Sequence, residues 1–197
     1  MILLKIPGID GILSLKQPQR KDVRTMVRKA TPADLDAIAA IYDDIHTNEE
    51  AGLTTVGWIR SIYPTRKSAE EAIAKGEMFV LEADGGVAAA AKINQEQVPE
   101  YANARWEHPA PDEKVMVLHT LVVSPKIKGK GYGSRFVDFY EAYAREKGCP
   151  YLRMDTNQRN LAARALYKKL GYREIGIVSC EFNGIPGVRL VCLEKKV

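Results

Sequence analysis

A glycine-rich stretch at residues 128–133 (Lys-Gly-Lys-Gly-Tyr-Gly) follows an apolar run that ends at Pro125. Apolar residues at helical spacing come next, at Phe136, Val137 and Tyr140, so the order is a strand, a loop and the start of a helix. Backbone N–H groups and the positive end of the helix dipole converge at such a place, and glycines let the backbone approach a ligand closely. Because the loop also carries lysines, we expect it to bind a phosphate or pyrophosphate group.

Two common phosphate-binding motifs do not fit this spacing. A Walker A loop requires Gly-Lys followed by Ser or Thr, whereas the Gly-Lys pair here is followed by another glycine. A dinucleotide-binding fingerprint requires a third glycine three residues after the second, and counting from the glycines of this loop reaches Ser134 or Phe136 instead. The pattern that remains is a strand, a basic residue at Lys128, and then Gly131 and Gly133 at the start of a helix.

This pattern resembles the acetyl-CoA loop of the GNAT-type N-acetyltransferases, Gln/Arg-x-x-Gly-x-Gly/Ala after a strand. Lys128 takes the place of Gln or Arg, and residues 123–125 (Val-Ser-Pro) fit the Val-x-Pro of the family. A second block at residues 157–172 is similar to the later family motif, Asn-x-x-Ala followed by Leu-Tyr-x-x-Leu-Gly-Phe, with Tyr172 in place of Phe. The two motifs together identify the chain as a member of this superfamily, and the resemblance extends over residues 26–197.

The resemblance implies the GNAT fold, an α/β (mixed α+β) domain with a central mixed, mostly antiparallel sheet of about seven strands flanked by helices. Hydrophobic periodicity and turn signals in the sequence agree with it. In the first half of the chain we expect a strand at 26–30, a helix from Thr31-Pro32, two short helices within 54–73 separated at Pro64, and a hairpin at 78–93. A strand at 115–123, a helix ending near Lys147-Gly148 and a strand at 151–155 should follow. The last expected elements are a helix capped by Asn160, with Ala162, Ala165, Leu166 and Leu170 toward the core, and a final hairpin turning at Asn183-Gly184.

The length of 197 residues suits one domain with a sizeable core. Residues 1–25 lack sustained periodicity, so we expect an appended arm, with Met26 as a candidate native start and residues 26–197 as the domain. The net charge of +4 comes without a basic tract, and we expect no nucleic-acid partner. The opening apolar residues are too few for a secretory core, and no apolar run approaches the length of a membrane span, so we expect no membrane association.

The three cysteines form neither an even set nor a Cys-x-x-Cys pair, which indicates reduced thiols in a cytoplasmic protein. The three histidines show no ligand spacing with each other or with a cysteine, so we expect no metal site.

The resemblance implies acetyl-CoA as the acetyl donor and coenzyme A as a product. Backbone N–H groups of the loop then hold the pyrophosphate, and the backbone near Leu121 and Val123 pairs with the pantetheine arm, with the Val123 N–H polarising the thioester carbonyl. Asn160 bonds the pantetheine amides in addition to capping its helix. The expected cofactor-binding residues are Leu121, Val122, Val123, Lys128, Gly129, Lys130, Gly131, Tyr132, Gly133, Ser134, Asn160 and Tyr167.

Tyr167 follows Asn160 by seven residues, which places both on one face of a helix. Analogy with the family makes Tyr167 the acid that protonates the coenzyme A thiolate, and the alternative is a tyrosine that only packs in the core.

The general base is less clear from the sequence, because residues 115–121 contain no acid where many family members carry a Glu. His119 is in phase with Leu121 and Val123 in a regular strand, and its intrinsic pKa suits accepting a proton near neutrality. We therefore expect His119 to be catalytic. The alternatives are a buried, hydrogen-bonded histidine at this position, with Glu113, Asp155 or water as the base.

The expected function is transfer of an acetyl group from acetyl-CoA to a primary amine of a small molecule or peptide by direct attack. Two alternatives remain, a protein acetyltransferase acting on chain termini or lysines, and a non-catalytic acetyl-CoA-binding sensor. The acceptor is expected near Trp58, Tyr63, residues 101–108 and the final hairpin, and an exposed terminal strand leaves a homodimer as a further alternative.

Overall fold

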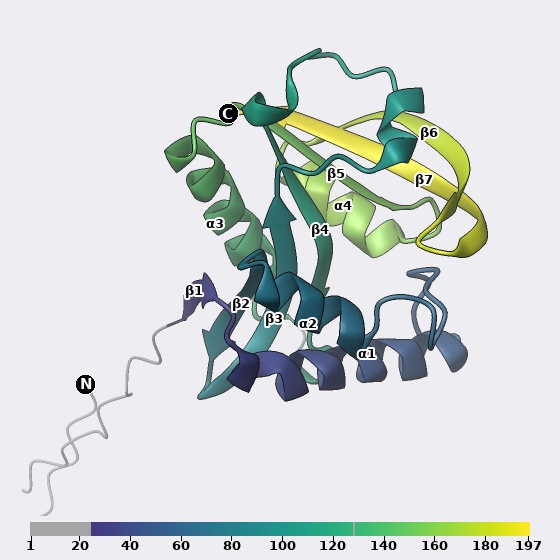
Figure 1. Ribbon diagram of the computed structural model, residues 1–197. Helices are drawn as coiled ribbons and strands as arrows, with labels where there is room; N and C mark the ends of the chain where they lie inside the picture. Colours follow the sequence, from purple (N-terminus) through teal and green to yellow (C-terminus); the bar gives the residue numbers. More distant parts are fainter. Residues whose placement is uncertain (1–24, 128) are drawn as a thin grey trace, which may run out of the picture.

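The computed structural model describes residues 25–127 and 129–197, so the expected arm and Lys128 lie outside the described residues. The described chain forms a seven-stranded sheet in the order β1-β2-β3-β4-β5-β7-β6 (Figure 1). Only β4 and β5 pair in parallel, and every other neighbouring pair is antiparallel, which confirms the mixed, mostly antiparallel sheet. The strands are β1 (Met26–Lys29), β2 (Met78–Ala83), β3 (Gly86–Asn94), β4 (Val115–Val123), β5 (Tyr151–Asn157), β6 (Arg173–Phe182) and β7 (Ile185–Lys196), and the helices are α1 (Leu35–Glu50), α2 (Arg66–Ala74), α3 (Tyr132–Glu146) and α4 (Leu161–Lys169).

Helices cover both faces of the sheet (Figure 1). Alternate residues of β2 belong to two different cores, because successive side chains of a strand point to opposite faces. Phe79 and Leu81 pack with α3 and α4, whereas Met78 and Val80 pack with α1 and α2. A third core lies beside β6 and β7 and includes Tyr101 from the long segment before β4. None of the helices in the described part of the chain is long and apolar enough to cross a bilayer.

An extra residue interrupts β4 near its middle. Val122 pairs with Ala90 but His119 pairs with Lys92, so two residues of β4 lie opposite one residue of β3. Thr120, at this bulge, has a φ of +55°, a left-handed conformation that β-branched residues rarely adopt.

The bulge changes which face the side chains on either side of it occupy. Met116 and Leu118, before the bulge, pack in the same core as Leu121 and Val123, after it. In a regular strand Leu118 and Leu121 would lie on opposite faces, because an odd number of positions separates them. His119 therefore points to the face opposite Leu121 and Val123. The prediction that these three residues are in phase is wrong, because it assumed a regular strand.

The strands β4 and β5 separate beyond the bulge. Their pairing runs from Val115 with Tyr151 to Leu118 with Met154 and then ends, although both strands continue for several residues. On its far side β5 stays paired with β7 to its last residue. The sheet is therefore open along one line between its two halves (Figure 1).

Two expectations about the helices need correction. Residues 54–73 contain one helix, α2, because residues 51–65 form an irregular segment held by a small bridge between Ile59 and Tyr63. On α4, Ala162 and Ala165 are exposed, and the buried face instead carries Tyr167 with the partly buried Ala163, Leu166 and Leu170. The remaining strands and helices form at the expected places, including the turn at Asn183 and Gly184, which both have positive φ.

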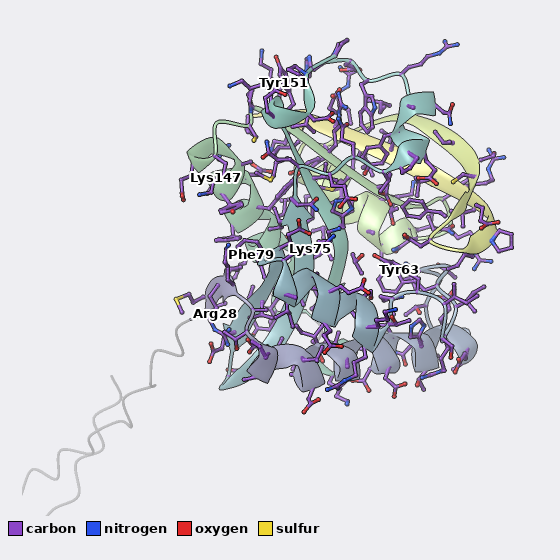
Figure 2. All side chains as sticks on the ribbon, in the orientation of Figure 1. Arg28, Tyr63, Lys75, Phe79, Lys147 and Tyr151 are labelled. Atoms are coloured by element: carbon purple, nitrogen blue, oxygen red, sulfur yellow. The ribbon has the colours of Figure 1, made fainter. Side chains whose placement is uncertain are left out.

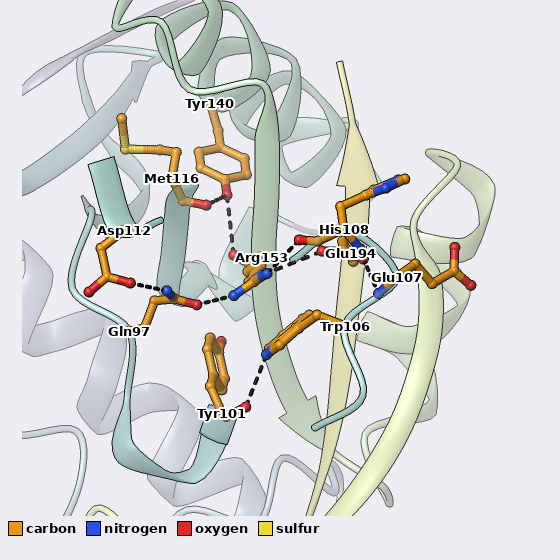
Figure 3. A network of polar contacts seen from close by, with 10 residues as sticks. All are labelled: Gln97, Tyr101, Trp106, Glu107, His108, Asp112, Met116, Tyr140, Arg153 and Glu194. Carbon is orange, nitrogen blue, oxygen red and sulfur yellow. Dashed lines mark hydrogen bonds and ion pairs between the residues drawn. The ribbon is translucent and has the colours of Figure 1, made fainter. Parts of the chain in front are cut away.

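A buried ion pair fastens the long segment between β3 and β4 to the sheet (Figure 3). Arg153 of β5 and Glu194 of β7 are 3.4 Å apart, and both side chains are almost fully buried. Glu194 accepts hydrogen bonds from the backbone N–H groups of Glu107 and His108, and Arg153 donates to the His108 carbonyl. Trp106 lies against the Arg153 guanidinium, 4.1 Å from ring centroid to Cζ. The residues around Trp106 thus anchor the segment instead of facing an acceptor, contrary to our expectation.

Removing one partner of this pair leaves the other charge buried and uncompensated. We expect Arg153→Met to lower the free energy of unfolding by about 3–5 kcal/mol in chemical denaturation. The matched control is Arg164→Met, which breaks the more exposed pair with Glu174 and should cost less than about 1 kcal/mol. Equal losses in the two variants would contradict an anchoring role for Arg153.

Candidate active site

The N-terminus of α3 presents free backbone N–H groups. Gly131 precedes the helix with a φ of +73° and contributes no capping side chain. The first helical hydrogen bond runs from the Arg135 N–H to the Gly131 carbonyl, 3.1 Å. The N–H groups of Tyr132, Gly133 and Ser134 therefore have no partner within the helix and coincide with the positive end of its dipole. This arrangement suits a phosphate group.

Close packing places this helix start beside the end of β4. A Cβ on Gly133 would lie 3.2 Å from Leu166 Cδ2 of α4 and 3.8 Å from Val123 Cγ2 of β4. Glycine thus lets α3 approach α4 and β4 closely. As a result, the start of α3 lies next to the last residue of β4, beyond the point where β4 and β5 cease to pair.

The lysines of the loop are engaged with carboxylates. Lys126 pairs with Asp44 at 2.8 Å, and Lys130 pairs with Asp84 at 2.7 Å. Lys128, which the sequence singled out, lies outside the described residues. Of the described residues, the two lysines are already partly neutralised, and the backbone N–H groups at the start of α3 and the exposed Arg135 of its first turn remain to attract an anion.

The last residues of β4 offer an unpaired backbone edge. The Ser124 N–H donates to the Ala88 carbonyl at 2.9 Å, toward β3. Because N–H groups alternate in direction along a strand, those of Leu121 and Val123 point the other way, where β5 has diverged. An extended ligand with amide groups can pair with this edge as an added strand does.

A cleft of about 630 Å³ occupies the gap between the two strands. Its walls come from the ends of β4 and β5, the start of α4, the irregular segment before α2 and the β6–β7 hairpin, and also from α1, α2, the start of β2, β3 and the residues that follow β3. They include Leu121, Val122, Val123, His119, Thr120, Asp155, Asn157, Asn160, Ala163, Tyr167, Trp58, Tyr63, Phe182 and Ile185.

The helix α4 brings two of the expected residues into this cleft. Asn160 Oδ1 accepts a hydrogen bond from the Ala163 N–H at 3.2 Å, so it caps the helix as expected. Tyr167 lies two turns further on and is 6% exposed. Burial, and then the nearby Asp155 carboxylate, raises the pKa of the Tyr167 phenol far above its usual range. Tyr167 is therefore protonated at every physiological pH.

Asp155 is a carboxyl group in the wall of the cleft, near the end of β5. Desolvation raises its pKa to about 7, although a hydrogen bond from Tyr101 opposes the shift. The Tyr101 hydroxyl donates to Asp155 Oδ2 at 2.8 Å. A carboxyl group that titrates near neutrality inside a cleft is suited to accept a proton from a substrate.

His119 also lines the cleft, but its surroundings make it a weak base. Its Nε2 atom lies 2.9 Å from Asn94 Oδ1, and burial, together with the charge of Lys92, lowers its pKa to about 4. Glu113, the other reserve, is exposed in a short turn before β4 and does not line the cleft. The structure therefore brings His119 and Asp155 together in the cleft but leaves Glu113 outside it.

The irregular segment before α2 closes one side of the cleft. Its Tyr63 hydroxyl contacts Thr120 Oγ1 at the bulge, and the side chain lies between the helical layer and the β6–β7 hairpin (Figure 2). A Cβ on Gly57 would fall 2.3 Å from Asn157 Nδ2, so only glycine allows this close approach. The Thr55 hydroxyl donates to the Arg159 carbonyl at 2.8 Å, beyond β5. The sequence had indicated Tyr63 but gave no sign of these contacts.

The profile of the acetyltransferase (GNAT) family matches residues 37–172. The chain belongs to this family. This GNAT acetyltransferase is 34% identical over 62 residues to the uncharacterized N-acetyltransferase YhfO of Bacillus subtilis (strain 168), a match that spans 32% of the chain and 42% of YhfO. The chain thus spans less than half the length of this curated relative.

Solved structures share the fold of this GNAT acetyltransferase. A GNAT-family acetyltransferase from Streptococcus agalactiae 2603 superposes with a TM-score of 0.73 at 24% identity, covering 88% of this chain and 95% of that one. A ribosomal-protein-alanine N-acetyltransferase from Brucella melitensis gives a TM-score of 0.67 at 21% identity, covering 87% and 99%. At these identities the likeness concerns the fold alone.

Substitution of Gly131 tests the role of the helix start. A Cβ there meets no atom within 4 Å, so Gly131→Ala acts only through the cost of a positive φ, about 1 kcal/mol. We expect a similar loss of stability from Gly148→Ala at the other end of α3, where φ is +71° and the space is also open. By calorimetry, coenzyme A should bind at least about tenfold more weakly to Gly131→Ala, whereas its affinity for Gly148→Ala should not change. Both variants strain the backbone, but only at Gly131 would the strained backbone present N–H groups to the phosphate. Equal affinities in the two variants would exclude the site.

Proposed function

We propose that this enzyme transfers the acetyl group of acetyl-CoA to a primary amine of a small molecule or peptide by direct attack. The observation that carries the proposal is the coincidence of two binding features at one opening. The free backbone edge of β4 at Val123 lines the cleft, and the start of α3 lies beside that edge, since a Cβ on Gly133 would be 3.8 Å from Val123. Together they suit a ligand that carries a diphosphate at one end and amides along an extended arm.

The described residues fit such a ligand. The N–H groups of Tyr132, Gly133 and Ser134 would hold the diphosphate. The edge of β4 at Leu121 and Val123 would pair with the pantetheine amides. The family role of Asn160 is to bond the same amides from α4. Bound there, acetyl-CoA supplies an activated acetyl group at the bottom of the cleft.

Three groups of the chain then act on the reaction. The Val123 N–H would donate to the thioester oxygen as negative charge develops there. Asp155 accepts a proton from the attacking amine, and Tyr167 donates its phenolic proton to the sulfur as the carbon–sulfur bond breaks. The new carbon–nitrogen bond leaves an amide and coenzyme A.

Asp155 is a better supported base than His119, which the sequence favoured. A base must be deprotonated before it can act, and it must still bind a proton at the working pH. Asp155, with a pKa of about 7, meets both conditions near neutrality, whereas His119, with a pKa of about 4, is always neutral but holds a proton poorly.

The enclosure of the cleft favours a small amine or a flexible chain end as acceptor. The irregular segment before α2 is tied to the loop beyond β5 by Thr55, and a Cβ on Gly184 in the β6–β7 turn would lie 3.3 Å from Ile62. These contacts join the irregular segment, which lines the cleft, to two neighbouring loops, and this enclosure fits a small amine or a chain end better than a lysine on the surface of a folded protein. A screen of small amines, peptides with free N-termini and folded proteins, read by release of free thiol, separates these classes. Binding of acetyl-CoA without thiol release across the whole panel would instead support a non-catalytic sensor.

The surroundings of the three cysteines suit a reducing compartment. All three are free thiols, and Cys149 and Cys192 are buried, so we include a cytoplasmic location in the proposal. The strand β6 forms one edge of the sheet, and pairing of this edge with a second copy would give a homodimer.

Tyr167→Phe tests the proton donor. We expect about 10²-fold slower turnover with unchanged affinity for acetyl-CoA, because the ring that packs in the core is retained and only the proton is lost. The matched control is Tyr172→Phe, a buried neighbour whose hydroxyl has no hydrogen-bond partner among the described residues. A wild-type rate for Tyr167→Phe would reassign that residue to packing.

The pH dependence of turnover distinguishes the two bases. With Asp155 as the base, turnover should rise with pH through about 7 and then level off, because only the ionised carboxylate accepts a proton. Asp155→Asn should lower turnover by about 10²–10⁴-fold, and His119→Gln should keep the midpoint. A profile that is flat from pH 5 to pH 8 would instead point to His119, whose titration is complete below that range.

Thermal denaturation of Asp155→Asn provides an independent check. The folded-state pKa of Asp155 lies above its unfolded value of about 3.9, so the wild type loses stability as the pH rises from about 4 to about 7. The neutral amide does not. The variant should therefore melt at a higher temperature than the wild type at pH 8, and the difference should vanish near pH 4.

A further inference from the structure

We propose that Tyr101 is a positioning residue, which the anchored segment before β4 delivers to the sheet to hold and tune the Asp155 carboxylate. The inference rests on the proposed function, in which Asp155 is the general base. It assigns a role to a segment that lies outside the strands and helices and that the family resemblance does not explain.

The contact between Tyr101 and Asp155 is well defined. The Tyr101 hydroxyl donates to Asp155 Oδ2 at 2.8 Å, and Tyr101 itself is 2% exposed. A bond to one carboxylate oxygen fixes the plane of the group and leaves Oδ1 as the oxygen for a substrate proton. Donation to the charged form also stabilises the carboxylate, which opposes the effect of burial.

The position of Tyr101 is fixed by its own neighbours. It belongs to a single turn at Pro99–Asn103, whose backbone N–H groups at Tyr101 and Ala104 bond to carbonyls within the same segment. The Trp106 Nε1–H donates to the Tyr101 carbonyl at 3.0 Å, and the two rings meet edge to face with centroids 4.9 Å apart (Figure 3). Trp106 in turn lies on the guanidinium of Arg153.

One strand carries both ends of this assembly. Arg153 and Asp155 are two residues apart on β5, so their side chains point to the same face. The segment holds Arg153 through Trp106 and reaches Asp155 through Tyr101. The buried pair of Arg153 with Glu194 thereby fixes the geometry of the base, which is ordered before any substrate binds.

Among the groups around Asp155, Tyr101 is the one that most lowers the pKa of its carboxyl group. Tyr101 and Glu100 come from the turn, Tyr63 from the irregular segment, Tyr167 from α4, and Cys180 and Cys192 from β6 and β7. His119 of β4 lines the same cleft. The tyrosines and cysteines have raised pKa values, and the pKa of His119 is lowered to about 4, so all of them are neutral near pH 7. Glu100 is the one carboxylate of this set. None of these groups is a cation, so the hydrogen bond from Tyr101 is the interaction that favours ionisation of Asp155.

The direct test is a pH titration of protein labelled with 13C at the aspartate carboxyl carbons, followed by NMR. Asp155→Asn identifies the resonance of Asp155 by its disappearance. We expect a midpoint near 7 in the wild type and an upward shift of about 1 pH unit in Tyr101→Phe, because one hydrogen bond to the charged form is lost.

Tyr140→Phe is the matched control. Tyr140 is also a buried tyrosine whose hydroxyl bonds to backbone carbonyls of Met116 and Arg153, away from the Asp155 carboxylate. This variant should lose stability but leave the midpoint in place. An unchanged midpoint in Tyr101→Phe, or an equal shift in Tyr140→Phe, would overturn the proposal.

Kinetics separate a failure of this inference from a failure of the proposed function. With an acceptor found by the amine screen, the midpoint of the kcat/KM profile should move upward in Tyr101→Phe by the same amount as the NMR midpoint, with wild-type turnover recovered at high pH. If the NMR midpoint moves and the kinetic one does not, Tyr101 tunes Asp155 but Asp155 is not the base, and the catalytic part of the proposal is overturned.

Discussion

The single extra residue in β4 determines much of the architecture of this acetyltransferase. A regular strand would have kept β4 paired with β5 along its whole length, and the backbone of Leu121 and Val123 would then be occupied by the sheet. The bulge at Thr120 turns the strand, ends the pairing after Leu118 and leaves one edge free. The left-handed conformation of a threonine is unfavourable by itself, and the contact of its hydroxyl with Tyr63 is one of the interactions that retain it.

In the cleft, burial disfavours the charged forms of the ionisable groups. Asp155 lies among tyrosines and cysteines, and no arginine or lysine in the described part of the chain compensates its charge, whereas Arg153, two positions earlier on β5, compensates Glu194. The strand β5 therefore carries Arg153, which has a buried anionic partner on β7, and Asp155, a carboxylate that is costly to ionise. Such a local conflict with the rules of stability is typical of a catalytic group, which needs a pKa near the working pH more than it needs a partner.

Local signals in the sequence predicted most of the sheet, the helix caps and the glycine-led start of α3. Gly131 and Asn160 occupy the expected places because their conformations depend on neighbours in the chain. The bulge at Thr120 could not be predicted, since nothing in an apolar strand marks an extra residue, and this reversed the face of His119. The position of Tyr101 against Asp155 depends on contacts between residues more than fifty positions apart, which periodicity does not report.

The ion pairs of the loop lysines affect how the enzyme responds to its solution. Lys126 and Lys130 already have carboxylate partners, so each attracts an incoming polyanion only weakly. Salt can therefore remove little attraction at these two side chains. Backbone N–H groups at the start of α3 contribute a further attraction, and salt screens the field of a helix dipole as well. Occupancy by the proposed donor should therefore still fall as the ionic strength rises, although by less than it would at a patch of unpaired lysines.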